Sequence, residues 1–168
     1  LFLHASVVYT SIFSLLTQVS GRSGRGDLRG RVILQTLNDE HPIFNYIRNH
    51  DYYGFYKQEL EVRKISAYPP FIRIIRLLIR GKDEDKVISS IGKLKDILNE
   101  RILESGEKIV LLGPSSAPFP KIGGNFRHHI ILKTKKLDLL RNIILESKKK
   151  LPSNGTYLEI DVDPYDLL

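Results

Sequence analysis

The stretch FIRIIRLLIRGKDEDKVISSIGKLKDILNERIL, residues 71–103, decides the fold because its hydrophobic period changes partway along. Its first part, FIRIIRLLIRG (71–81), is a run of aliphatic residues interrupted by arginines and predicts a strand. Its second part, DEDKVISSIGKLKDILNERIL (83–103), repeats apolar residues at helical spacing and predicts an amphipathic helix. The apolar stripe of that helix consists of Val87, Ile88, Ile91, Leu94, Leu98 and Ile102.

The same two periods alternate through the rest of the C-terminal region. Further strands are expected in KIVLLG (108–113, ended by Gly113 and Pro114), FRHHIILKTK (126–135) and TYLEIDVD (156–163), and a further helix in LDLLRNIILESKKKL (137–151). The order over residues 70–163 is β-α-β-β-α-β, which is the ferredoxin-like arrangement. Two helices would cover one face of a four-stranded antiparallel sheet, and alternation along the third strand would place Arg127, His129, Ile131 and Lys133 on the open face.

The N-terminal third predicts helices and one short strand. Apolar spacing indicates a helix over 6–19, on Val8, Ile12, Leu15, Leu16 and Val19, and RVILQT (31–36) is a candidate strand. Asn38 or Asp39 is expected to cap a short helix with Pro42 in its first turn. A helix over 52–65 follows, and its residues Tyr52, Phe55, Tyr56 and Leu60 are either core or a platform for stacked bases. The prolines of AYPPF (67–71) then mark a boundary.

Composition narrows the class of protein. The 168 residues contain no methionine and begin LFLHASVVYTS, so we expect a C-terminal fragment of a longer protein. The absence of cysteine excludes disulfides and cysteine-ligated zinc within this segment. No apolar run is long enough to cross a bilayer, and no targeting signal is evident, which favours the cytoplasm.

The net charge of +7 is concentrated in one region. Residues 121–150 contain nine lysines and arginines against Asp138 and Glu146, whereas residues 155–168 contain four acidic residues and neither lysine nor arginine. A basic region of this kind suits the phosphates of nucleic acid, and the alternative is a solvated helix face. The residues expected to contact DNA are Lys121, Arg127, Lys133 and Lys135.

Three further features leave alternatives open. The loop GPSSAPFPKIGGNFR (113–127) is either a contact with DNA or a partner, since Lys121, Phe126 and Arg127 gather there, or a long hairpin connection. His128 and His129 are adjacent on a strand and would point to opposite faces, so no metal site is expected. Asp161 and Asp163 lie two apart on one face and suggest a surface or interdomain contact rather than a catalytic carboxylate pair.

An arginine pair stands out in LLTQVSGRSGRGD (15–27). Arg22 and Arg25 are three residues apart among small residues, and Gln18 precedes them by one helical turn. Guanidinium groups bind phosphate oxygens well, and charge neutralisation drives phosphoryl transfer. Three interpretations of the pair are open: it binds the γ-phosphate of a nucleotide, it contacts nucleic acid as a generic RG-rich loop, or it is a solvated turn.

The stretch LLTQVSGRSGRGDLRGRVILQT (15–36) resembles motif VI of superfamily 2 helicases, and more closely the C-terminal part of the primosomal protein N′ (PriA) family of replication-restart DNA helicases. The resemblance continues in FYKQELEVRKISAYPPFIRIIRLLIRG, in LLGPSSAPFPKIGGNFRHHIILKT and in LEIDVDP. It covers residues 13–168 in order, with four separated motifs in register.

The resemblance implies three parts. Residues 1–36 would end the second RecA-like helicase lobe, residues 37–66 would be connecting helices, and residues 67–168 would form a C-terminal DNA- and partner-binding domain. Gln18, Gly21, Arg22, Gly24 and Arg25 would face ATP and Mg²⁺, with Arg25 as arginine finger, Arg22 supporting the phosphates and Gln18 coupling nucleotide to DNA.

The resemblance also implies a function for the whole protein. The family unwinds DNA 3′ to 5′ at stalled forks, helps to assemble the primosome, and binds forked and single-stranded DNA and the single-stranded-DNA-binding protein. These 168 residues contain neither a G-x-x-x-x-G-K-[ST] loop nor the family's zinc-binding cysteines, so this segment alone is expected not to hydrolyse ATP. The alternatives are a stand-alone nucleic-acid-binding module without ATPase activity and a non-functional gene relic.

Overall fold

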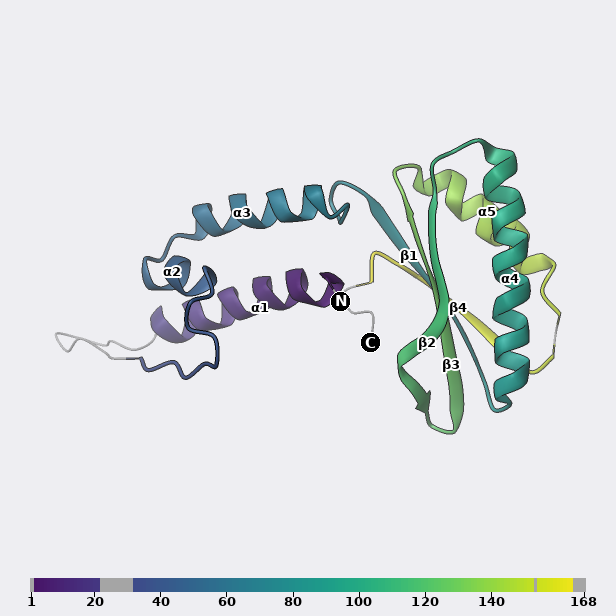
Figure 1. Ribbon diagram of the computed structural model, residues 1–168, viewed down its shortest axis with the longest axis horizontal. Coiled ribbons are helices and arrows are strands. Elements are labelled where there is room, and N and C mark those ends of the chain that lie inside the picture. The colour runs from purple at the N-terminus through teal and green to yellow at the C-terminus, as the bar shows by residue number, and fades with distance from the viewer. Residues whose placement is uncertain (1, 22–31, 153, 165–168) are drawn as a thin grey trace. The chain divides into compact units, whose positions relative to one another are not determined.

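The computed structural model describes residues 2–21, 32–152 and 154–164. They divide into two compact units, Leu1–Ser66 and Ala67–Leu168. The first unit is helical, and the second combines a sheet with two helices (Figure 1).

The first unit contains α1 (Phe2–Gly21), α2 (Ile43–Arg48) and α3 (Tyr52–Ile65). Its small core is built on Phe13, Ile43 and Phe55, and the rings of Phe13 and Phe55 stack with their centroids 4.3 Å apart. The Asp51 carboxylate accepts a hydrogen bond from the Gly54 amide at 2.8 Å and so caps α3. The predictions of helices in these three places are confirmed.

Several details of the first unit differ from the prediction. Residues 32–36 form no strand, because a strand needs a pairing partner and the described residues of this unit offer none. Pro42, not Asn38 or Asp39, lies at the start of α2. Of the expected core aromatics in α3 only Phe55 is buried, whereas Tyr52 and Tyr56 are exposed and stack on each other.

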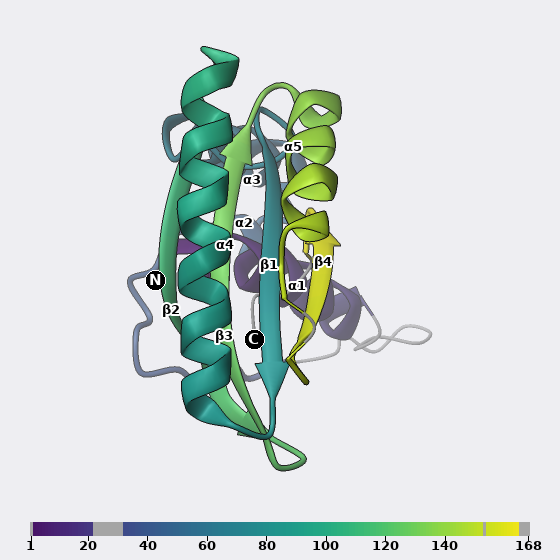
Figure 2. The ribbon, with the colours of Figure 1, turned by 90° about the vertical axis from the view of Figure 1, so that its right-hand side faces the viewer.

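The second unit confirms the ferredoxin-like prediction. Its elements are β1 (Arg73–Gly81), α4 (Glu84–Ser105), β2 (Val110–Ile122), β3 (Asn125–Thr134), α5 (Leu137–Lys149) and β4 (Tyr157–Val162). The strands pair in the order β2-β3-β1-β4, and each neighbouring pair is antiparallel. Both helices lie on one face of the sheet (Figure 2).

The core lies between the helices and that face of the sheet. It is filled by every second residue of the two central strands and by the apolar stripes of the helices: Ile75, Leu77, Ile79, Ile130, Leu132, Val87, Ile91, Leu94, Leu98, Leu140, Ile143 and Ile144. Burying one such side chain contributes about 1.5–3 kcal/mol. Because the period of a strand is two, the burial of Ile75, Leu77 and Ile79 turns Arg76 and Arg80 to the opposite face, whereas Arg73 lies at the start of the strand beside the beginning of α5.

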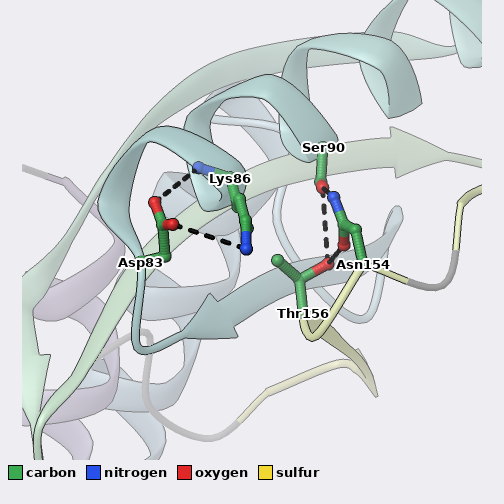
Figure 3. A network of polar contacts seen from close by, with 5 residues as sticks. All are labelled: Asp83, Lys86, Ser90, Asn154 and Thr156. Atoms are coloured by element: carbon green, nitrogen blue, oxygen red, sulfur yellow. Dashed lines mark hydrogen bonds and ion pairs between the residues drawn. The ribbon is translucent and has the colours of Figure 1, made fainter.

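Polar contacts fix both ends of α4. The Asp83 carboxylate accepts a hydrogen bond from the Lys86 amide, and Gly106 at φ 67° ends the helix. Farther along α4, the buried hydroxyl of Ser90 accepts a hydrogen bond from the side-chain Nδ2 of Asn154 at 2.9 Å. The Thr156 hydroxyl donates to the side-chain Oδ1 of Asn154 at 2.8 Å (Figure 3). This network attaches the segment that leads into β4 to helix α4.

Strand β2 is longer than expected. The strand does not end at Gly113 and Pro114 but continues to Ile122 through two irregularities in its pairing with β3. Gly113 has φ 99°, and a Cβ there would lie 2.9 Å from the His129 carbonyl oxygen, so only glycine fits the first irregularity. The prolines of β2 are tolerated because β2 is an edge strand whose outer amides need no partner.

Candidate nucleic-acid interface

The face of the sheet opposite the helices carries charged side chains in two halves of different character. Strands β1 and β4 form one half, and strands β2 and β3 form the other. Between the charged residues lie the buried side chains Ile74, Leu78 and Ile131, whose cross-strand neighbours are Lys133, His129 and Arg76. Long cationic side chains cover apolar surface with their stems while keeping their charge in water.

In the β1–β4 half each arginine of β1 meets a carboxylate of the C-terminal segment. The ion pairs are Arg73 with Asp163 at 2.5 Å, Arg76 with Asp161 at 3.2 Å, and Arg80 with Glu159. Asp163 also accepts a hydrogen bond from the Ile74 amide at 2.9 Å. We call these six side chains the ion-pair ladder. Asp161 and Asp163 thus pair with arginines of their own unit while their side chains stay 45% and 29% exposed, which agrees with the expected surface contact.

The β2–β3 half has no such compensation. From Lys108 to Leu137 the sequence contains no aspartate or glutamate. We call β2 and β3 with Lys121, Arg127 and Lys133 the basic ribbon. Among the described residues, none of these three cations is paired with a carboxylate.

The tip of the basic ribbon brings Lys121, Phe126 and Arg127 together, as the sequence suggests. The Lys121 ammonium lies 4.1 Å from the centroid of the Phe126 ring, and one guanidinium nitrogen of Arg127 donates a hydrogen bond to the Phe119 carbonyl at 3.2 Å. Gly123 and Gly124 form the two-residue turn with φ of 54° and 77°, values that favour glycine. Register places Lys121 and Phe126 toward the helix side and Arg127 on the opposite face.

Lys133 lies on the same face as Arg127 but near the far end of β3, in a different environment. Its ammonium donates to the Ala67 carbonyl at 3.3 Å and lies 4.2 Å from the centroid of the Tyr68 ring. Burial lowers the pKa of Lys133 and raises the pKa of Tyr68. Lys133 therefore holds the start of this unit against the sheet, a contact that the sequence did not indicate.

Lys135 is exposed and lines a hollow of about 770 Å³ with Arg73, Lys136 and Asp138. Lys136 pairs with Glu107, and Arg73 belongs to the ion-pair ladder. Lys135 is thus the cation of this hollow with no ion pair among the described residues.

His129 lies on the face opposite the helices, between the two halves. Burial lowers the pKa of His129 from its ordinary value of 6.5, and the charges of Arg76, His128 and Arg127 lower it further. Among the described residues, its Nδ1 atom has no hydrogen-bond partner. Its neutral form is therefore favoured near neutral pH.

The expected nucleotide site lies mostly outside the described residues. Arg22, Gly24 and Arg25 are not among them. Gln18 is exposed in the last turn of α1, and Gly21 is the last residue of that helix. The described residues also contain no group of three or more His, Asp or Glu side chains placed to hold a metal ion. No described helix is both long and apolar enough to span a membrane.

Fold and surface together define a ferredoxin-like α+β domain with an uncompensated basic ribbon. A family model described as the primosomal protein N C-terminal domain matches residues 64–165. The chain belongs to the primosomal protein N C-terminal domain family.

Curated relatives match nearly the whole chain. Replication restart protein PriA of Synechocystis sp. is 36% identical over 156 residues, which are 92% of this chain and 18% of that protein. The proteins of the same name from Borreliella burgdorferi and Bacillus subtilis are 36% and 30% identical, over 94% and 93% of this chain and 24% and 20% of their own lengths. The chain thus spans about a fifth of the length of these relatives.

Proposed function

We propose that this chain is the C-terminal part of an ATP-dependent 3′-5′ DNA helicase that restarts stalled replication forks and assembles the primosome in the bacterial cytoplasm. In this proposal, residues 1–36 form the end of the second helicase lobe, and residues 37–66 form the helices that connect it to the C-terminal domain. Residues 67–168 form that domain, which binds DNA and partner proteins. The name shared by the relatives supports the replication role. The observation that carries DNA binding is the basic ribbon, where three cations have no carboxylate partner within the part of the chain that the structure describes.

The contrast within one sheet makes the ribbon the better DNA surface. Cations already paired with carboxylates offer little net field to a phosphate, whereas unpaired cations release condensed counterions from DNA on binding. Arg127 and Lys121 are therefore the principal phosphate contacts at the tip. Lys135 is a further contact, and Lys133 contributes field while it holds Ala67.

The motor assignment rests on Gln18, Arg22 and Arg25. We assign Arg25 as the arginine finger, Arg22 as a phosphate contact and Gln18 as the link between nucleotide and DNA. The exposed apolar side chains of Leu15, Val19, Ile33 and Leu37 support a lobe whose core continues in a longer protein. ATP and Mg²⁺ are bound mostly by that lobe's partner, and zinc by other parts of the longer protein.

The motor assignment is tested in the longer protein. Arg25→Ala is expected to lower DNA-stimulated ATPase by about a thousandfold, because an arginine finger contributes roughly 10³–10⁵ to turnover. Arg29→Ala, four residues along, is the control and should retain activity. Normal ATPase in Arg25→Ala would remove Arg25 from the site.

The DNA-binding assignment is tested on the 168-residue chain. Lys121→Glu with Arg127→Glu is expected to weaken binding of a fluorescent single strand by roughly thirtyfold at low salt and to reduce the slope of log affinity against log salt by about 1.5. Lys93→Glu with Lys95→Glu, which makes the same change in charge on α4, is the control. Equal losses in the two variants would show that only net charge matters and would contradict the ribbon.

A stand-alone binding module is the second candidate, and the separate core of Ala67–Leu168 favours it. Such a module would bind DNA with the same salt dependence and use no ATP. Detection of the chain in cells as a product of its own, with no longer protein containing it, would favour the module over the helicase.

A further inference from the structure

The second irregularity of β2 displays an aromatic ring at the edge of the basic ribbon. Ser116 pairs with His128 and Lys121 pairs with Phe126, so the four residues 117–120 lie opposite the single residue Arg127. We call Ala117–Pro118–Phe119–Pro120 the bulge. Ala117 is its buried member at 3% exposure, whereas the Phe119 side chain is 52% exposed.

A hydrogen bond and two prolines constrain the backbone of the bulge. Arg127, on the neighbouring strand, donates a hydrogen bond to the carbonyl of Phe119 itself. The prolines on either side of Phe119 fix their own φ angles, and a residue that precedes proline is restricted to extended conformations. Phe119 is thus displayed by a constrained backbone, which lowers the entropy lost when a ligand binds the ring.

The surroundings of Phe119 select the kind of ligand. Lys121 follows it by two residues, Arg127 contacts its carbonyl, and no acidic residue occurs in β2 or β3. An exposed ring among unpaired cations matches a ligand with flat apolar faces joined by negative charges. Unpaired nucleotides have this form, because their bases are free to stack on an aromatic ring while their phosphates meet lysine and arginine.

We propose that Phe119 is a stacking platform for an unpaired base, with Arg127 and Lys121 contacting the flanking phosphates. The proposal rests on the proposed DNA-binding function and deepens it, because stacking on Phe119 distinguishes a single strand from a duplex, whose bases are already stacked. The ribbon's charge then provides affinity for any DNA, and Phe119 provides the preference for unpaired regions. The β2–β3 turn projects beyond the end of β1 (Figure 2), so β1 does not cover the tip of the ribbon.

A single-tryptophan variant tests the stacking directly, because the chain contains no tryptophan. In Phe119→Trp, an oligothymidylate of about 12 nucleotides is expected to quench the emission, since stacked bases quench indole fluorescence and single-strand-binding domains contact roughly 4–16 nucleotides. An abasic oligonucleotide of the same length and charge should leave the emission nearly unchanged. Phe71→Trp, at the other phenylalanine exposed by 40% or more among the described residues, is the control and should be quenched by neither.

Binding affinity provides a second test of the stacking. Phe119→Leu keeps apolar bulk but removes the ring, and it should bind oligothymidylate about tenfold more weakly while binding abasic and duplex DNA within about twofold of the parent chain. Phe119→Tyr, which keeps a ring, should bind like the parent chain.

The outcomes separate the proposal from the function on which it rests. If the Lys121→Glu/Arg127→Glu variant loses affinity but Phe119→Leu does not, the DNA-binding function stands and the platform is overturned. Equal quenching of Phe119→Trp by abasic DNA also overturns stacking. If the parent chain binds no oligonucleotide at low salt, both fall, and loss of binding to a protein partner in Phe119→Leu would then identify the ring as a protein contact.

Discussion

The two halves of the charged sheet face use the same kind of residue for opposite purposes. In the β1–β4 half, three arginines each meet a carboxylate, so the cations hold an edge strand to a central one. In the β2–β3 half, Arg127 and Lys133 have no carboxylate partner among the described residues, and each instead donates a hydrogen bond to a backbone carbonyl. Equal numbers of cations can therefore leave very different net charge on a surface, and this difference is the reason for proposing β2 and β3 as the DNA-binding side.

Among changes to the β1–β4 half, giving it an excess of cations is expected to have the largest effect on single-strand affinity. Glu159→Lys with Asp161→Lys removes two ladder carboxylates and adds two cations beside Arg76 and Arg80. We expect single-strand affinity to rise roughly tenfold at low salt and the free energy of unfolding to fall by about 2 kcal/mol.

Anisotropy and urea unfolding measure the two quantities, and Glu159→Gln with Asp161→Asn is the milder control. If affinity falls in the lysine variant while the fold persists, the field of this face does not govern DNA binding.

Within the ladder, burial should decide which ion pair matters. Arg76 has a side chain exposed by only 14%, and Arg80 by 39%. Arg76→Met is expected to lower the free energy of unfolding by about 1–2 kcal/mol, because it removes the hydrogen bond that a largely buried guanidinium donates to Asp161, and Arg80→Met by less than about 1 kcal/mol, because exposed pairs contribute little. Both should change DNA affinity by less than about threefold.

Urea unfolding of the two methionine variants provides the comparison. A greater loss for Arg80→Met would show that contacts other than the ion pairs join β1 to β4.

The smallest expected effect is a pH dependence from His129. The pKa of His129 is lowered in the folded protein, chiefly by burial and then by Arg76, so the unfolded chain takes up the proton first as pH falls. The contribution of His129 to stability is therefore complete above about pH 6.5 and is lost as pH falls through the lower folded pKa. The free energy of unfolding should fall more between about pH 7.5 and pH 5 for the parent chain than for His129→Phe.

The control for this prediction is a titration of the imidazole by NMR. Arg76→Met should raise the pKa of His129 toward its ordinary value. Equal loss of stability with and without His129 would assign the pH dependence to other groups.

Much of the fold follows from the sequence because strand and helix periods are separated cleanly in the C-terminal unit. The buried residues Leu94 and Leu132 lie where helical spacing and alternation predict them. The length of β2 was missed, because Gly113 and the prolines ordinarily end a strand and only an edge position lets it continue. The strand expected over 31–36 was wrong in its described part, 32–36, because local pattern does not provide a pairing partner.

The candidate site was predictable in composition but not in arrangement. Charge in the sequence points to Lys121 and Arg127, whose role in DNA binding stays a prediction. The ion pairs of the β1 arginines, in contrast, depend on a register between residues 79 to 90 positions apart. Lys133 was read as a DNA contact, and its contact with Ala67 depends on how the entering chain crosses the sheet. Phe119 was missed as a candidate because only the register of β2 against β3 shows that it stands on a bulge.

The most direct test is to map amide chemical shifts of the 168-residue chain as a single strand is added at low salt. The account predicts shifts concentrated in β2 and β3, largest from Ala117 to Arg127, with few in β4. Shifts concentrated along β1 and β4, with the bulge unchanged, would contradict it and would place the binding surface on the ion-pair ladder.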